Sequence, residues 1–172
     1  MFGKEADVLS ASKESGGYDT YPSAFQFGYQ FEKQYLNEGN FQALVEFIPM
    51  VTGVDHQMFI PSLTFLNGFR NNKGGWEIGI GPTFSITKKV DGGIVNGTFY
   101  TNDQLSTMGV KDYASVSKLD NRGTPSLNSA LIVAFGRTLK SGKLNIPVNI
   151  WASVPNSDGW RLGISVGYNG KK

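Results

Sequence analysis

The first candidate for chemistry is the single histidine of this 172-residue chain, His56, which directly follows Asp55. A carboxylate beside an imidazole can orient the ring for acid–base catalysis or for binding a metal ion. The sequence offers no cysteine and no second histidine to complete a metal site, and nothing marks a serine nucleophile as its partner. We therefore predict that His56 is an ordinary solvated loop residue, and that the chain has no catalytic, metal or cofactor site.

Repeated glycines are the second candidate, because glycine-rich loops cradle phosphate groups in nucleotide-binding proteins. Gly79 and Gly81, and again Gly163 and Gly167, recur at even spacing without the Lys-Ser/Thr pair of such a loop. Residues at even spacing share one face of a β-strand. The glycines are therefore predicted to pack inside β-strands.

The segment from Trp160 to Tyr168 shows the strand pattern most clearly. Its even-numbered residues are large and apolar, while Arg161, Gly163 and the other odd-numbered residues are small or charged. This period of two predicts a strand with one bulky apolar face and one small or polar face. The bias suits a barrel that is surrounded by lipid and has a narrow polar interior.

Seven segments carry this alternation and are predicted to be strands joined by hairpins: 24–36, 41–51, 58–70, 76–88, 128–139, 144–154 and 160–169. The tight turns 37–40, 71–75 and 140–143 fall at one edge of the sheet, and the connectors 53–57, 89–127 and 156–159 fall at the other.

Parity predicts one more strand, which we assign to the N-terminal segment 1–23, with 6–12 as its candidate. The barrel then covers 24–169, and 170–172 form a tail. The connector 89–127 is predicted to be a long polar loop that contains a hairpin around Asn96-Gly97.

Composition excludes several classes of protein. No apolar run approaches the roughly 18 residues of a membrane helix. The absence of cysteine excludes a disulfide scaffold, and a net charge of +2 without a basic stripe gives no sign of nucleic-acid binding. A mean hydropathy of −0.22 does not count against a membrane location, because only alternate residues of a transmembrane barrel's strands meet lipid. The N-terminal residues lack a signal-peptide pattern, so an exported protein is expected to be represented either in its mature form with an added initiator methionine or in a truncated form.

Together these features resemble the small eight-stranded outer-membrane β-barrels of the outer membrane protein A, X and W type. The resemblance covers about residues 24–169 and lies in strand length, in short turns at one edge and in longer loops at the other. It implies an all-β, antiparallel up-and-down transmembrane barrel of about eight strands in the outer membrane. One departure is the C-terminus, where Tyr168 stands in for the usual final aromatic residue.

The barrel interpretation assigns residues to three places by their phase along the strands. The predicted lumen polar cluster is Gln30, Glu32, Glu46, Glu77, Asn149 and Arg161, with the carboxylates expected to form ion pairs that fill the interior. The residues predicted to face lipid are Phe27, Tyr29, Ile78, Ile80, Phe84, Leu162, Ile164 and Val166. The predicted interface aromatics at the short-turn edge are Tyr35, Phe41, Phe69, Trp76 and Tyr168. At the same edge, Arg137 is placed where its head can reach lipid phosphates.

The resulting hypothesis is a non-enzymatic barrel with a structural or adhesive role, or one that lets small solutes pass to a limited extent. Its expected partners are membrane lipid or detergent, with envelope proteins possible and nucleic acid excluded. One alternative is a soluble lipocalin-like barrel that binds an apolar ligand, in which the bulky face would point inward. Another is a barrel subunit of a larger envelope complex. A lipid-modifying enzyme is disfavoured, because a nucleophile–base pair is missing.

Overall fold

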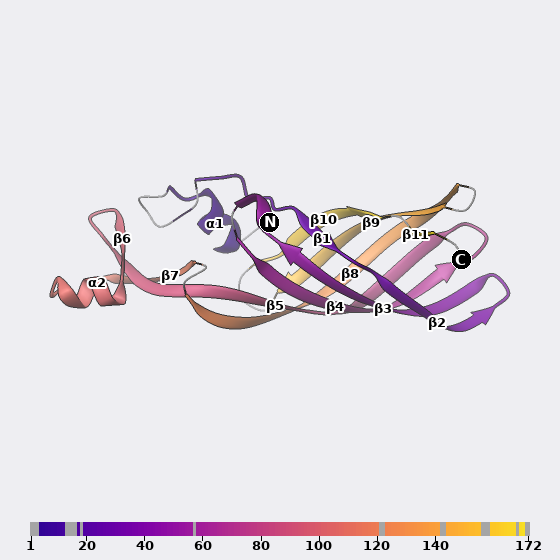
Figure 1. Cartoon of the computed structure of the whole chain (residues 1–172), viewed down its shortest axis with the longest axis horizontal. Helices are drawn as coiled ribbons and strands as arrows, with labels where there is room; N and C mark the ends of the chain where they lie inside the picture. The colour runs from indigo at the N-terminus through magenta and orange to yellow at the C-terminus, as the bar shows by residue number, and fades with distance from the viewer. Residues whose placement is uncertain are drawn as a thin grey trace.

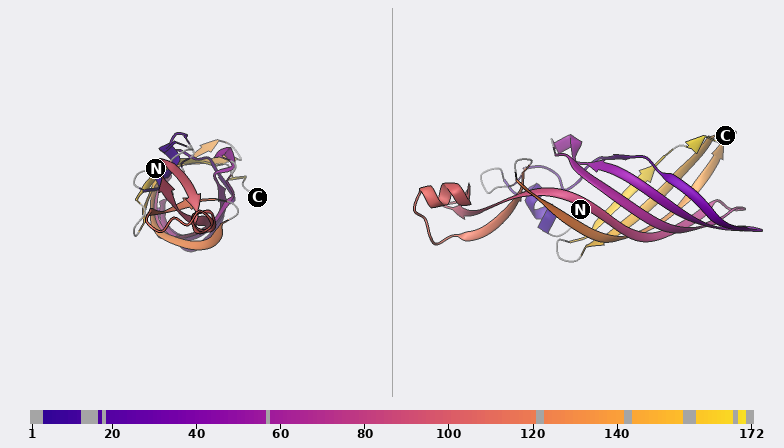
Figure 2. Two further views of the ribbon diagram at one scale, coloured as in Figure 1. Left: turned by 90° about the vertical axis from the view of Figure 1, so that its left-hand side faces the viewer. Right: turned by 60° about the horizontal axis from the view of Figure 1, so that its bottom comes forward.

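The structure is a computed structural model that describes residues 4–12, 17, 19–56, 58–120, 123–141, 144–155, 159–167 and 169–170. Its eleven strands form one antiparallel sheet. The sheet curls about its long axis, as the end-on view in Figure 2 shows, so that it encloses an interior. The predicted all-β class is confirmed at this level, as a half-barrel.

The curled part of the sheet contains nine strands: β1 (Gln26–Gly28), β2 (Phe31–Glu38), β3 (Phe41–Thr52), β4 (Ile60–Asn71), β5 (Trp76–Val95), β8 (Thr124–Ser141), β9 (Leu144–Pro155), β10 (Arg161–Val166) and β11 (Asn169–Gly170). The remaining elements are α1 (Lys4–Ser10), the short 3-10 helix η1 (Val54–His56), β6 (Thr98–Thr101), α2 (Asn102–Thr107) and β7 (Ala114–Leu119).

The strands follow one another as a meander in the order β1, β3, β4, β5, β8, β9, β10. β2 continues β1 along β3 in the same register, since Gln26 pairs with Thr52 and Phe31 with Phe47. The break between β1 and β2 lies opposite Pro49, which has no N–H to donate, although its carbonyl accepts a bond from Tyr29. β1 and β2 therefore act as one edge strand.

The meander has seven positions, so its two edges, β1–β2 and β10, run in the same direction. Each strand of an antiparallel sheet runs opposite to its neighbour, so the seventh strand runs in the same direction as the first. Among the described residues, no strand pairing joins these two edges. On the edge strands, residues in the inward phase such as Gln30, Gln34 and Ser165 are exposed, whereas Thr64 and Ser153 on inner strands are buried.

The predicted arrangement of connectors is present. The turns after β2, β4 and β8 lie at one end of the sheet, and the connections after β3, β5 and β9 lie at the other (Figure 1). Residues 142–143 and 156–158 of two connectors lie outside the described residues. We call the end that carries the turns after β2, β4 and β8 the short-turn end, and the opposite end of the sheet the arm end.

Two sequence-based expectations differ from the structure. The segment 6–12, assigned to an eighth strand, falls mostly in the helix α1, because Lys4–Ser10 lacks the bulky alternating residues that a strand on this sheet would need. The second is the connector 89–127, which is largely ordered structure. β5 runs on to Val95, and β8 begins at Thr124.

This ordered connector, which we call the arm, projects beyond the curled sheet (Figure 1). The end of β5 pairs with β6 on one side and with β7 on the other, and the predicted hairpin at Asn96-Gly97 joins β5 to β6. Thr101 and Gln104 form a capping box that starts α2, and Leu105 is 1% exposed. The arm therefore has a small core of its own.

Side chains alternate between the two faces along most of the curled sheet, although the consecutive residues Ala43 and Leu44 are both buried. On β5, Thr83, Ser85 and Thr87 are buried inside, while Phe84 and Ile86 are exposed outside. Other buried polar residues are Glu46, Thr52, Thr64 and Ser153, and the buried apolar residues of the sheet are Ala43, Leu44, Leu66 and Ile132. The interior is thus rich in hydroxyl groups and the exterior is apolar.

Candidate functional site

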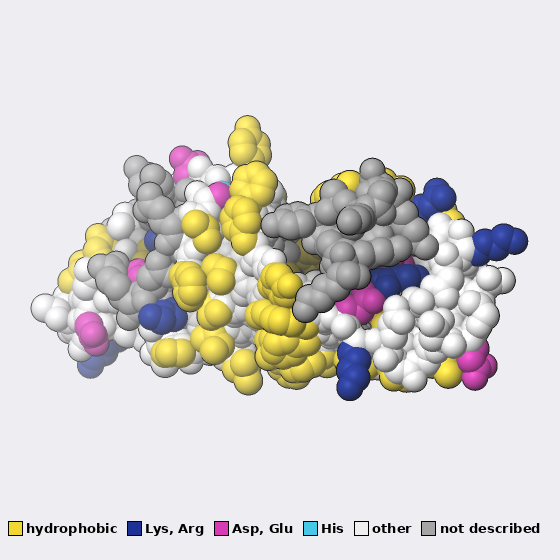
Figure 3. Space-filling model, turned by 45° about the vertical axis from the view of Figure 1, so that its right-hand side comes forward, with side chains coloured by type: hydrophobic (Ala, Val, Ile, Leu, Met, Phe, Trp, Pro, Cys, Tyr) yellow, Lys and Arg dark blue, Asp and Glu magenta, His cyan; other side chains and the backbone are white. Residues whose placement is uncertain are grey.

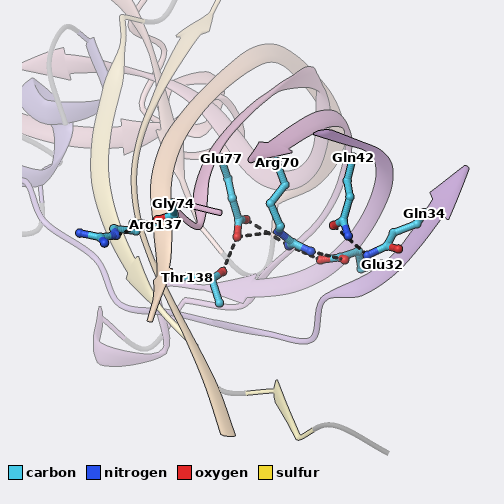
Figure 4. Close-up of polar contacts among 8 residues, drawn as sticks. All are labelled: Glu32, Gln34, Gln42, Arg70, Gly74, Glu77, Arg137 and Thr138. Carbon is cyan, nitrogen blue, oxygen red and sulfur yellow. Dashed lines mark hydrogen bonds and ion pairs between the residues drawn. The ribbon is translucent and has the colours of Figure 1, made fainter. Parts of the chain in front are cut away.

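An ion-pair cluster occupies the interior near the short-turn end, and Arg70 of β4 lies at its centre (Figure 4). Its guanidinium donates to both carboxylate oxygens of Glu32 on β2, at 2.6 and 2.5 Å. It also donates to Glu77 on β5, at 2.8 and 3.2 Å. One cation therefore joins three strands, and it reaches across β3 to hold the edge strand.

The cluster extends to both sides of Arg70. The hydroxyl of Thr138 on β8 donates to Glu77, and the amide of Gln34 donates to Gln42 at 2.9 Å. Glu46 is only 8% exposed and lies near the carboxylates of Glu32 and Glu77. Charged and hydrogen-bonding side chains therefore occupy the interior at this end of the sheet.

Four of the six predicted lumen residues belong to this region. Glu32, Glu46 and Glu77 surround Arg70, and Gln30 is close enough to hydrogen-bond to Glu46. Asn149 of β9 points toward Gly136 of β8, where only a glycine leaves room for its amide. Within the described part of the chain, no hydrogen bond joins Asn149 to Arg70, Glu32 or Glu77.

Arg161 is not the cation of this cluster. It lies at the beginning of β10, opposite Ser153 of β9, toward the arm end. Arg70 was not among the predicted lumen residues, although its sequence position indicates an inward side chain, because it alternates with the outward residue Phe69. It is also the register partner of Glu77 across the β4–β5 hairpin.

His56 was expected to be a solvated loop residue, but its side chain is largely covered. Its Nε2 lies 2.6 Å from the carbonyl oxygen of Ser23, and its side chain is 14% exposed. The neighbouring Asp55 accepts a hydrogen bond from the backbone N–H of Phe25 at 3.2 Å and lies 3.3 Å from His56. The pair therefore fastens the chain that leads into β1. Within the described part of the chain, no group of three or more His, Cys, Asp or Glu residues could hold a metal ion.

The outer face carries a broad apolar surface, which we call the apolar belt. Figure 3 shows hydrophobic side chains gathered over the middle of one face, with charged side chains mainly toward its two ends. The eight residues predicted to face lipid all lie on this outer surface and are 38–75% exposed: Phe27, Tyr29, Ile78, Ile80, Phe84, Leu162, Ile164 and Val166. A surface of this size is unusual for a monomer in water.

The height of the apolar belt follows from β5. Its outward residues are apolar from Trp76 to Ile86, and the next outward residue is the exposed Lys88. Ten residue steps at about 3.3 Å each span about 33 Å along the strand, which at the tilt of about 40° usual in outer-membrane barrels corresponds to a rise of about 25 Å. That height equals the apolar band of outer-membrane barrels.

Aromatic residues mark the short-turn end of the belt. Tyr35, Phe41, Phe69 and Trp76 are all exposed there, and the Phe41 and Phe69 rings stack with their centroids 5.4 Å apart. Tyr168, the fifth predicted interface aromatic, lies outside the described residues.

Comparisons with known protein families, curated proteins and solved structures found no match. None of the helices described in the structure is long and apolar enough to cross a membrane. The structure itself defines a class: a curled antiparallel sheet with an apolar outer face and a polar, ion-paired interior.

Proposed function

We propose that this protein is an integral outer-membrane β-barrel whose interior is mostly filled and which holds the arm at the membrane surface. The observation that carries the proposal is the inverted distribution of side chains. Glu46, Thr64 and Ser153 are buried, while Ile164 and Val166 are 75% and 69% exposed. Exposing these apolar side chains costs free energy in water, whereas in the hydrocarbon of a bilayer it does not.

The same distribution opposes the lipocalin-like alternative. A soluble barrel that binds an apolar ligand needs bulky apolar residues inside and polar residues outside. Here the inner face of β5 carries threonine and serine, and its outer face carries isoleucine and phenylalanine.

The filled interior favours a structural or adhesive role over solute passage. Arg70 and its partners occupy the lumen near the short-turn end, and barrels of about eight strands are only wide enough for side chains. The arm, at the opposite end, has its own buried residue Leu105 and a capped helix. In outer-membrane barrels the longer connections face outward from the cell, where a folded arm can contact other molecules.

A bilayer also requires the two parallel edges to be hydrogen-bonded, because exposed backbone groups are very costly in hydrocarbon. We propose that β10 meets the edge strand β1–β2 directly, since the described chain offers no other strand at this seam. The chain has no cysteine, so introduced cysteines report cleanly. A cysteine at Ile164 should form an intramolecular disulfide with one of a series at Phe27, Tyr29 and Phe31. If the introduced cysteines form no disulfide and are joined only by a chemical cross-linker about 10 Å long, a further strand lies between the two edges, because that length is about twice the spacing of neighbouring strands.

The location is tested by purification and reconstitution. The protein should remain monomeric only in detergent or lipid, and it should show a β-type circular dichroism spectrum. In planar bilayers it should give no conductance or small, infrequent openings. A concentrated, monodisperse monomer in plain buffer would contradict the membrane location. Large steady currents would contradict the filled interior.

A further inference from the structure

A stack of three side chains lies on the outer face at the short-turn end. The rings of Phe135 and Trp76 are stacked with centroids 5.3 Å apart, and the guanidinium of Arg137 lies 5.2 Å from the centroid of the Trp76 ring. Arg137 and Trp76 are register partners on β8 and β5. We call this arrangement the rim stack.

The turn between β4 and β5 holds Arg137 in place. Gly75 has a φ of +70° and packs against the carbonyl of Thr138, so the turn leans over β8. This brings the carbonyl oxygen of Gly74 to 3.0 Å from Nε of Arg137. Figure 4 shows Arg137 directed away from the luminal cluster, on the opposite side of the sheet from Glu77.

The terminal nitrogens of Arg137 are the chemically active part of the rim stack. Among the described residues, no carboxylate forms an ion pair with Arg137. Its Nε is used by Gly74 and one face of its guanidinium covers Trp76, which fixes the orientation of the two terminal nitrogens. A planar, fixed guanidinium is well suited to bind a phosphate group through two hydrogen bonds.

Two further observations point to a phospholipid as the source of that phosphate. Trp76 marks the end of the apolar belt, which is the level of headgroups in a bilayer. Below it, Phe135 and Ile78 are 48% and 50% exposed and offer an apolar surface to an acyl chain. Lys73, exposed in the same turn, adds a second positive charge.

We propose that the rim stack, with Lys73, binds the phosphate of an anionic phospholipid such as phosphatidylglycerol. The inference rests on the proposed membrane location, and it adds a specific lipid site on the short-turn side. A phosphate would be held by the Arg137 guanidinium through two hydrogen bonds, Lys73 in the neighbouring turn would add positive charge, and the acyl chain would follow Phe135.

Fluorescence quenching tests the site directly. Trp151→Phe and Trp160→Phe leave Trp76 as the only indole, and the protein is placed in phosphatidylcholine vesicles that contain a small fraction of acyl-brominated lipid. Brominated phosphatidylglycerol should be enriched about tenfold near Trp76 relative to brominated phosphatidylcholine, as expected for a charge-assisted hydrogen bond. Arg137→Gln should return the ratio to about one, and Arg137→Lys should retain part of the enrichment.

The controls separate this proposal from the membrane location. A protein with Trp160 as its only indole reports the arm end and should show no preference between the two lipids. Equal quenching of Trp76 by both lipids would overturn the rim site while leaving the membrane location standing. If neither lipid quenches either indole, the membrane location itself fails.

Two further outcomes are decisive. Inorganic phosphate added at millimolar concentration should leave the enrichment unchanged, and loss of the enrichment would show that the site binds free phosphate instead. If Arg137→Gln does not fold, Lys73→Gln gives the second test, with an expected loss of about half of the enrichment. An unchanged enrichment in Lys73→Gln would remove Lys73 from the site.

Discussion

Replacing Arg70 by methionine tests the luminal cluster most sharply. The substitution keeps much of the side-chain volume and removes the cation that, among the described residues, contacts both Glu32 and Glu77. The two carboxylates would remain in the interior, together with the buried Glu46. We expect a large loss of stability, because burying an unpaired charge is costly.

The magnitude follows from burial. The side chains of Arg70, Glu32 and Glu77 are 17%, 19% and 10% exposed, so the pairs are mostly shielded from water. Removing one partner of a buried ion pair costs about 3–5 kcal/mol. Glu32 is still 19% exposed, so water can relieve part of the cost. We therefore expect about 3 kcal/mol for Arg70→Met.

The assay is reversible urea unfolding in lipid vesicles, with bilayer conductance as a second measurement. The matched control is Arg137→Met, which removes an arginine near the same end but from the outer face, and it should cost less than about 1 kcal/mol. The triple variant with Glu32→Gln, Arg70→Met and Glu77→Gln should recover most of the lost stability, because the two carboxylates that Arg70 had paired with are then replaced by neutral amides. Equal losses for Arg70→Met and Arg137→Met would refute the cluster as a buried network.

Three further predictions use the same unfolding assay. Ile164→Arg should cost about 2–4 kcal/mol if Ile164 faces the middle of the bilayer, whereas Ser165→Thr should be mild; a tolerated arginine would mean that the faces are inverted. Gly81→Ala should cost about 1–3 kcal/mol, because a Cβ there overlaps the backbone of β4, whereas Gly79→Ala, with its nearest neighbour 3.5 Å away, should change stability little. His56→Ala should cost about 1 kcal/mol and speed hydrogen exchange at the start of the edge strand; unchanged exchange would show that the clamp contributes nothing.

The period-two pattern was sufficient to predict strands in the seven segments and, along β5, which residues are buried and which are exposed. This success has a physical basis, because a one-residue error in a strand would exchange its two faces. The assignments of Ile80 and Ile164 to the outer face and of Glu46 to the inner face depend only on that alternation. Contact with lipid remains a prediction.

The pairing inside the lumen was harder to predict, for a reason that Arg70 illustrates. Its contact with Glu77 follows from the hairpin, because the two residues are register partners. Its contact with Glu32 does not, since β3 lies between their strands and only the curl of the sheet brings the side chains together. Sequence alternation carries no information on that curl, and Arg161 was therefore an equally reasonable cation.

In the arm, too, the local structure could be predicted from the sequence but the non-local strand pairing could not. Its local signals were present in the sequence, namely the Asn96-Gly97 turn and the Thr101–Gln104 capping box, and both form. What joins them is the non-local pairing of β7 with β5, in which Ile94 pairs with Ala114. Gly93 allows this close packing, since any Cβ there would overlap the Tyr113 ring. A polar composition therefore does not make a connector unstructured when glycines let a third strand and an aromatic ring close over it.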